Sequence, residues 1–487
     1  MKNTISIKKV KNLHYIFMGF IVFVYCILGI YYNNPDSDSY FLINTGKYIV
    51  ENRALPEYNV WTWHKNFGIV VQQWIACILN YCYYNIAGDA GLMLMALVNT
   101  IISNIMAWKY TGLYTSNKYE RFVALLGFNF IMKPYMNSRP TILTVCYILF
   151  ELITLTKYSR DTLNDTQYIL RMSLVSLLLV NWHSSFWLLS FVMILPFMVP
   201  AVWDIKNADW KQSLSYLKCV VPMIIAGILN PNGIKAFSYF LNSYGSISNQ
   251  IVISELAQPT FTCIFGIVIV TVLILVISYT LVGDREKDKV YLGLGTLILA
   301  SMHVRNNWLL VFTAMQMLIW LQKLLLKNKD EDFETSKVLY TLIALAYTIT
   351  GFIVGIVMLS MVLEHKTDEK YYVPTKAIEY LDGLDKNEIL LYNEFAAGNY
   401  LALKGYKVYI DARPEIYTPR ISGVDDNIYE EYIDILTGKA DYEEVLNKRN
   451  FTHLIVNANS FFDIYLDCQD DYTVVVESET YKLYERQ

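Results

Sequence analysis

Charged residues are scarce in this chain. They make up 17% of its 487 residues, whereas a soluble domain carries about 25%. Apolar residues reach 54%. Apolar runs of about 17 to 25 residues recur over the first three quarters, each long enough to cross a hydrocarbon core of roughly 30 Å. The shortage of charge therefore excludes an ordinary soluble protein and predicts a multi-pass integral membrane protein.

Several motifs are missing as well. The seven cysteines are scattered and form neither a CxxC motif nor a paired framework, which favours small core residues over a disulfide scaffold. No GxGxxG sequence and no P-loop occurs, so nothing indicates nucleotide binding, and we expect no nucleic-acid partner.

The first apolar run, 13–32, is not followed by a cleavage site and is too long for a signal-peptide core. We therefore interpret it as a signal anchor.

Charge is divided unevenly along the chain. Residues 366–487 contain 24 acidic and 13 basic side chains, against 20 acidic and 27 basic before them. This tail has no apolar run long enough to span a membrane, and short β-rich runs alternate in it with helical stretches. We predict a membrane domain over 1–365, with its first external loop at 33–88, and a small α/β domain over 366–487.

Basic residues between the apolar runs set the predicted orientation, because short positive loops stay cytoplasmic. If the run 69–87 crossed the membrane, every later basic loop would lie on the outer side. Its glutamines, asparagines and aromatic residues also suit a helix that lies in the membrane interface. The remaining segments give about eleven spans, at 13–32, 89–108, 119–136, 141–157, 168–181, 186–202, 213–229, 259–282, 290–303, 306–325 and 338–361. The amino terminus is then cytoplasmic and the acidic carboxyl-terminal domain extracytoplasmic.

Polar residues at the outward turns share one surface in this topology. Asp36 and Asp38 follow the first span directly, and a charged side chain beside the hydrocarbon usually has a task. Arg139 precedes a proline at a turn, where its fork of donors suits a phosphate. Two polar segments that contain a histidine interrupt the apolar runs on the same side of the membrane. Together with Arg305 they favour a phosphate-binding or proton-handling site. The remaining candidates on this face are His183, Asn230, Glu255, His303 and Arg305.

Several candidates also have a structural explanation. Asp36 and Asp38 suit the cap of a helix that begins near Ser39, and Arg139 can snorkel to nearby carbonyls. A lone histidine at a turn is often a satisfied structural residue. The long loop from Asn230 to residue 259 can either close over a substrate or simply connect two spans.

The order of these short motifs resembles the GT-C fold glycosyltransferases of the bacterial type. Residues 36–91 carry Asp-x-Asp-x-Tyr-Phe, Asn-Thr-Gly-Lys, Leu-Pro, Trp-Thr and Gln-Trp, and the sequences Arg-Pro, Asn-Trp-His, Asn-Pro-Asn-Gly and His-Val-Arg follow downstream. The resemblance covers most of the membrane domain. It implies an enzyme that takes a sugar from a polyprenyl phosphate carrier on the outer face, as protein mannosyltransferases, the aminoarabinose transferase and oligosaccharyltransferases do.

An acidic residue of the first external loop is the signature of that fold. The resemblance therefore implies that Asp38 is the essential carboxylate, with Asp36 beside it, in an inverting transfer. A base must take the proton of the acceptor hydroxyl, and cations must hold the departing phosphate; we assign the cations to Arg139, His183, His303 and Arg305. Some members of the fold need a divalent cation such as Mg²⁺ or Mn²⁺, for which Asp36, Asp38 and Glu255 would supply oxygens, and other members need none.

The carboxyl-terminal domain offers a second pair. Strands are expected at 388–392, 406–410, 452–456, 472–476 and 481–484. Asp411 and Arg413 follow the second of them, and open α/β sheets bind ligands at the carboxyl ends of strands. They also resemble an Asp-x-Arg element in the tails of proteins of this type. We expect this pair, with Asn230 and Glu255, to recognise the acceptor; an ion pair that pins a loop explains it equally well.

The favoured function is transfer of a sugar from a polyprenyl-phosphate donor to an extracytoplasmic glycan, lipid or protein of the cell envelope. A transporter or flippase of lipid-linked sugars would place its ionisable residues near mid-membrane, whereas here they gather at the outer ends of spans. A glycan polymerase with a lipid diphosphate donor needs the same cations and stays open, as does a scaffold with a degenerate site. The sequence names neither the donor sugar, the acceptor nor the oligomeric state.

Overall fold

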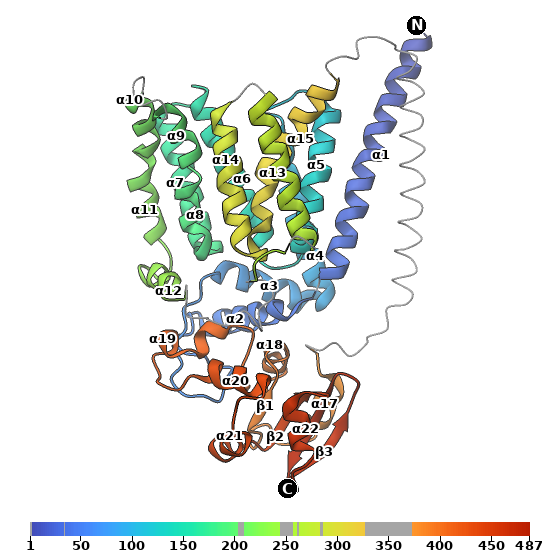
Figure 1. Ribbon diagram of the computed structural model, residues 1–487, viewed down its shortest axis with the longest axis vertical. Helices are drawn as coiled ribbons and strands as arrows, with labels where there is room; N and C mark the ends of the chain where they lie inside the picture. Colours follow the sequence, from blue (N-terminus) through green and yellow to red (C-terminus); the bar gives the residue numbers. More distant parts are fainter. Residues whose placement is uncertain are drawn as a thin grey trace.

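The computed structural model describes residues 2–33, 35–202, 209–243, 257–260, 263–282, 286–326 and 373–487. A bundle of roughly parallel helices lies at one end, and a small α/β domain lies at the other. Helices α2 and α3 run crosswise between these two parts (Figure 1). The domain boundary predicted at 365/366 falls outside the described residues.

The bundle is built from helices whose apolar side chains form one large buried core. Short 3-10 segments connect several of them, and two of these, η2 (Ser184–Phe186) and η6 (Val304–Leu309), lie at the end of the bundle nearest α2 and α3. The bundle helices are α1 (Lys2–Asn33), α4 (Asp89–Thr111), α5 (Lys118–Met132), α6 (Thr141–Ser159), α7 (Asp165–Trp182), α8 (Trp187–Val192), α9 (Leu195–Val202), α10 (Trp210–Ser215), α11 (Val220–Ile228), α13 (Ile264–Val282), α14 (Lys287–Met302) and α15 (Leu310–Leu326).

Among the described residues, four helices are long and apolar enough to cross a membrane, namely Asp89–Thr111, Thr141–Ser159, Ile264–Val282 and Val304–Leu325. A fifth results if Met18–Asn33 and Ser37–Asn52, which meet at 79°, count as one bent span. The count of eleven therefore stays a prediction. The expected span 338–361 lies outside the described residues.

Two expected spans are interrupted. The segment 186–202 divides into α8 and α9, and Pro196 lies in the first turn of α9. The segment 213–229 passes through the 3-10 segment η4 (Tyr216–Cys219) before α11, which has Pro222 in its first turn. Proline lacks the N–H that would continue the preceding helix, so a new helix starts at these places.

Helices α2 (Ser37–Asn52) and α3 (Trp74–Ala87) pack closely against each other. A Cβ added at Gly46 of α2 would lie 2.0 Å from the carbonyl oxygen of Cys77 in α3, so only glycine allows this approach. Helix α3 lies across the ends of the bundle helices rather than among them (Figure 1). This placement agrees with the prediction that the run 69–87 does not cross, although its helix begins only at Trp74.

The carboxyl-terminal domain contains a four-stranded sheet of order β1-β2-β4-β3 within the described residues 373–487. β1 and β2 are parallel, with Leu391 opposite His453, and the other pairs are antiparallel. The connection from β1 to β2 runs through helices, as parallel pairing requires. The elements are α17 (Thr375–Leu381), β1 (Leu391–Asn393), α18 (Gly398–Leu403), η7 (Pro414–Tyr417), α19 (Pro419–Ser422), α20 (Ile428–Thr437), α21 (Tyr442–Arg449), β2 (His453–Asn457), α22 (Phe461–Leu466), β3 (Tyr472–Glu477) and β4 (Tyr481–Arg486).

The strand expected at 406–410 is wrong. This segment runs beside β1, but the side chain of Asn393 replaces the backbone pairing: its Oδ1 accepts from the Tyr409 N–H at 2.9 Å and its Nδ2 donates to the Ile410 carbonyl at 2.8 Å. The segment instead forms a single parallel bridge between Val408 and Thr62 of the first external loop. Asp411 and Arg413 therefore do not follow a strand of the sheet.

Residues 57–71 of the first external loop belong in space to the carboxyl-terminal domain. Phe67 is buried in that domain's core, and the Trp63 indole donates to the Leu391 carbonyl at 3.0 Å. The His64 ring lies 2.9 Å from the Tyr409 carbonyl oxygen. The predicted division into two consecutive domains is thus crossed by the first external loop.

Candidate functional site

Asp36 caps helix α2. Its Oδ1 accepts from the backbone N–H of Ser39 at 2.9 Å and from the Ser39 hydroxyl at 2.5 Å. Its Oδ2 accepts from Arg139 Nε at 2.6 Å and from Asn137 Nδ2 at 3.3 Å. The cap explanation therefore holds for Asp36, and its position is set by four hydrogen bonds.

Asp38 is the second residue of α2 and has a different environment. Its Oδ2 is 3.1 Å from Nη1 of Arg139, so one guanidinium bridges both carboxylates. Each of these three side chains keeps about a quarter of its surface exposed, with 29% for Asp38. Asp38 and Arg139 line a cavity of about 130 Å³, and Asp36 does not. The structure thus separates the two aspartates: one positions the helix and the other faces the cavity.

Arg305 lines the same cavity on the η6 side. Its guanidinium is exposed and is not paired with a carboxylate among the described residues. Arg139, in contrast, is already bound to two carboxylates. Arg305 is therefore the cation in this cavity with its charge available for an anionic ligand.

His183 is buried and also lines the cavity. The Thr144 hydroxyl donates to the Pro140 carbonyl at 3.0 Å and lies 3.0 Å from His183 Nδ1. Since the hydroxyl proton is committed to Pro140, Nδ1–H is the donor to Thr144. The other ring nitrogen, Nε2, then carries the acceptor lone pair. This arrangement suits a bond from a ligand hydroxyl better than the phosphate contact expected from the sequence.

Trp308 supplies a buried donor that sequence reasoning missed. Its side chain is fully buried and lines the cavity, yet its indole Nε1 has no hydrogen-bond partner among the described residues. Buried donors are nearly always satisfied, so this unpaired donor is a candidate contact for a ligand of the cavity. Its position two residues beyond the His-Val-Arg-Asn sequence was the only signal.

Several other lining residues belong to motifs that the sequence marked but were not selected as site residues. They lie in the segments before and after Arg139, at the amino end of α3, and in α2, η2 and α13. They include Phe41, Leu42, Gln73, Tyr135, Asn137, Thr141, Phe186 and Phe265.

Two further predicted site residues do not line the cavity, and a third is not described. His303 caps the end of α14 and is not among the residues that line the cavity. Asn230 organises its own turn, donating to the carbonyls of Gly227 and Gly233 at 2.9 and 3.2 Å. Glu255 falls outside the described residues.

The described residues contain no group of three His, Cys, Asp or Glu side chains that could hold a metal ion. Arg139 already binds both carboxylates at this site. A dication at the same oxygens would have to compete with that guanidinium. Among the described residues both carboxylates are therefore bound by a guanidinium, and the third oxygen donor expected from the sequence, Glu255, lies outside them.

The carboxyl-terminal domain holds the start of α2 in place. Asn399 of α18 donates to the Ser37 carbonyl at 3.1 Å and its own carbonyl accepts from Asn44 at 3.1 Å. The Ser37 hydroxyl donates to the Ala396 carbonyl at 2.7 Å. Because Ser37 lies between the two aspartates, these bonds set the position of Asp38 from the far domain.

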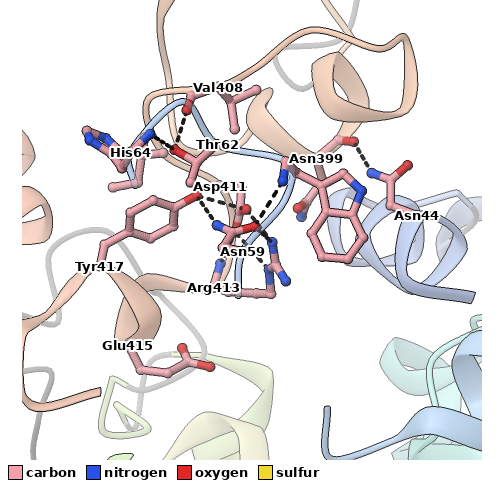
Figure 2. A network of polar contacts seen from close by, with 12 residues as sticks. Asn44, Asn59, Thr62, His64, Asn399, Val408, Asp411, Arg413, Glu415 and Tyr417 are labelled. Atoms are coloured by element: carbon pink, nitrogen blue, oxygen red, sulfur yellow. Dashed lines mark hydrogen bonds and ion pairs between the residues drawn. The ribbon is translucent and has the colours of Figure 1, made fainter. Parts of the chain in front are cut away.

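Asp411 and Arg413 form a closed cluster under the loop. Arg413 donates to both Asp411 oxygens, at 3.0 and 2.6 Å, and to Asn59 Oδ1 at 3.2 Å. Tyr417 adds a bond to Asp411 at 2.9 Å and receives one from Asn59 at 3.1 Å (Figure 2). Burial alone would lower the pKa of Arg413, but the charge and hydrogen bonds of Asp411, together with Tyr417 and Glu415, raise that pKa. The pair fixes residues 57–71 to the domain.

The loop after Asn230 also reaches this domain. Helix α12 (Lys235–Ser243) contacts it, and the Tyr239 hydroxyl donates to Glu415 Oε1 at 3.0 Å. Burial raises the pKa of Glu415. Part of the expected long connection is therefore an ordered helix against the carboxyl-terminal domain.

Comparison with known proteins supports the fold. No protein-family model matches the chain, and a search of curated proteins gives no significant match. Among solved structures, the chain is similar to the archaeal oligosaccharyltransferase AglB from Archaeoglobus fulgidus, determined with an inhibitory peptide and a dolichol-phosphate. The TM-score is 0.55 at 12% identity, and the match covers 92% of this chain and 69% of that chain. The likeness supports a GT-C-like membrane fold.

Proposed function

We propose that this protein is a membrane glycosyltransferase that takes its sugar from a polyprenyl-phosphate donor. The observation that carries the proposal is the cavity where Asp38 and Arg139 from one side meet Arg305, His183 and Trp308 from the other. A carboxylate, an available cation and hydrogen-bonding groups for a sugar are thus gathered at one end of the bundle. The fold shared with an oligosaccharyltransferase solved with dolichol-phosphate supports the same function.

The chemistry follows from these groups. The acceptor hydroxyl gives its proton to the Asp38 carboxylate as its oxygen forms a bond to the anomeric carbon. The bond between that carbon and the phosphate oxygen breaks, and its electron pair leaves with the polyprenyl phosphate. Arg305 holds the phosphate as this negative charge develops. Arg139 keeps Asp38 oriented through the 3.1 Å ion pair.

Inversion at the anomeric carbon is the expected stereochemistry. A retaining enzyme with a covalent intermediate needs a second carboxylate as nucleophile. Asp36 is the nearest such group in sequence, and its oxygens bind Ser39, Asn137 and Arg139. A single direct displacement with Asp38 as base therefore suits the geometry.

The decisive experiment measures label transfer from a panel of extracted polyprenyl-phosphate sugars to envelope acceptors by the purified protein in liposomes. We expect Asp38→Asn to lower the rate by about 10² to 10⁴-fold, the usual contribution of a general base. The matched control is Asp165→Asn, which removes a carboxylate paired with Lys218 at the opposite end of the bundle. It should transfer at the wild-type rate.

Binding of the carrier gives a second measurement. The wild-type protein should bind unlabelled polyprenyl phosphate, and Arg305→Gln should weaken that binding while Asp38→Asn leaves it unchanged. Equal transfer by wild type and Asp38→Asn would contradict the base assignment. Failure of the wild type to bind any polyprenyl phosphate would contradict the donor class and favour another function.

A further inference from the structure

A second polar hollow lies at the other end of the bundle. Helix α7 runs from Asp165 to Trp182, and its last residue precedes His183 of the candidate site. Its first two turns, the last turn of α6, the α6–α7 connection and the start of the α4–α5 connection line a cavity of about 450 Å³. Eighteen residues of helix separate the two places by about 27 Å, so this hollow is a distinct feature.

Its charged lining is entirely basic. Lys157, Arg160 and Arg171 are the only ionisable side chains among its lining residues, which also include Thr162 and Gln167. None of the three cations is paired with a carboxylate in the described part of the chain. Arg160 donates to the Leu113 carbonyl at 2.8 Å, which fixes its position without neutralising its charge.

Asp165, in the first turn of α7, is paired with a cation that is not among the lining residues. Asp165 lies 2.5 Å from Lys218 and accepts from the Tyr158 hydroxyl at 2.7 Å. The amino end of α7 adds the positive end of a helix dipole to the same place. Three cations that converge on one hollow repel each other, and an anion there would relieve that repulsion.

An apolar surface continues directly from the hollow. Gln167, Arg171 and Leu174 are spaced four and three residues apart, so they share one face of α7. Leu174 is 45% exposed and the neighbouring Leu170 is 64% exposed. Along this face a hydrogen-bonding group, a cation and then exposed leucine follow each other. That order matches the polar head and the acyl chain of a lipid.

We propose that this hollow binds the phosphate head group of an anionic phospholipid, with its acyl chains along the exposed leucines of α7. Basic pockets between helices at a membrane surface are suited to such head groups. The loop charges predict that this end faces the cytoplasm, so the lipid would belong to the leaflet opposite the candidate site. The proposal does not depend on the transferase activity.

Native mass spectrometry of the full-length protein tests this proposal, with phosphatidylglycerol and phosphatidylcholine as probes. The wild type should retain phosphatidylglycerol in preference. Lys157→Gln and Arg171→Gln should each weaken that binding about fivefold, the contribution expected of one cation near an anionic head group. The matched control is Lys218→Gln, which removes a cation at the same end that is not among the lining residues; it should bind as the wild type does.

Three results would overturn the proposal. The first is equal retention of the two lipids by the wild type. The second is unchanged retention in the double variant Lys157→Gln/Arg171→Gln, whose folding is checked by its melting temperature. The third is complete displacement of phosphatidylglycerol by millimolar inorganic phosphate, which would assign the hollow to a soluble anion instead.

Discussion

Two pairs of aspartate and arginine, each joined by short ion pairs, occupy different settings in this molecule. Asp38 and Arg139 keep 29% and 23% of their side chains exposed and line a cavity. Asp411 and Arg413 keep 1% and 12% and are surrounded by Asn59 and Tyr417. The same chemical pair is therefore open to a ligand in one place and closed in the other. Burial and hydrogen-bond saturation, rather than residue type, distinguish a candidate site from a structural clamp.

Breaking the closed pair should have the largest effect on stability. Arg413→Ala leaves Asp411 buried without its cation, and loss of one partner of a buried pair costs about 3 to 5 kcal/mol. The comparison variant is Arg139→Ala, whose partners are partly exposed and should cost about 1 kcal/mol or less. Thermal unfolding measures both. Equal losses of stability would show that the two pairs are not different in kind.

Acid should weaken the region around the closed pair. Burial lowers the pKa of His64 to about 4, whereas an unfolded histidine titrates near 6.5. Because the unfolded chain binds a proton that folded His64 does not, stability falls as the pH drops from about 6.5 to about 4. Each pH unit costs about 1.4 kcal/mol, roughly 3 kcal/mol in all.

The test compares thermal unfolding of wild type and His64→Gln across this pH range. The variant should lose less stability on acidification, since it carries no titrating group at this position. Parallel pH curves for the two proteins would contradict the assignment to His64.

The hydrogen bonds from the carboxyl-terminal domain to the start of α2 should have a smaller effect, on the rate of transfer at the Asp38–Arg139 pair. Asn399→Ala removes the bond to the Ser37 carbonyl, so Asp38 is held less firmly. Misplacement of a catalytic group lowers the rate, and we expect a fall of about tenfold in kcat with little change in KM. Steady-state kinetics of transfer measures this. A change confined to KM would argue against a positioning role.

The smallest effect concerns Asp36. Asp36→Ser keeps a favourable helix cap, so stability should change by less than about 0.5 kcal/mol, whereas Asp36→Ala should lose about 1 kcal/mol. If Asp36 only caps α2, the serine variant transfers sugar at close to the wild-type rate. Loss of transfer with unchanged stability would instead give Asp36 a catalytic role.

Part of the site could be predicted from the sequence. The parity of the basic loops placed Asp36, Asp38, Arg139, His183 and Arg305 on one surface, and the structure brings four of these five to one cavity. His303 was selected by the same reasoning and lies outside the lining, since it ends α14 one residue before the turn of η6. The pattern of basic loops therefore predicts which side of the membrane a residue faces, but it does not predict which residues on that side line the cavity.

Other features required contacts between distant residues. The expected strand 406–410 has suitable β-forming residues, but the Asn393 side chain takes the bonds that a strand would have used. The first external loop enters the core of a domain that begins more than 300 residues later. No local pattern in residues 57–71 marks that partnership.

The amino-acid sequence alone determined that this chain contains several apolar segments long enough to cross a membrane and that its tail is a small α/β domain. It also placed the candidate carboxylates and cations at one end of the predicted spans. These properties depend on composition and on local spacing. Only the tertiary structure decided which aspartate faces the cavity and which Asp–Arg pair is buried. It also decided that the buried Trp308 indole has no hydrogen-bond partner among the described residues. Those outcomes depend on burial and on hydrogen bonds between residues 100 or more positions apart, such as Asp36 and Arg139. Local sequence patterns do not predict such contacts.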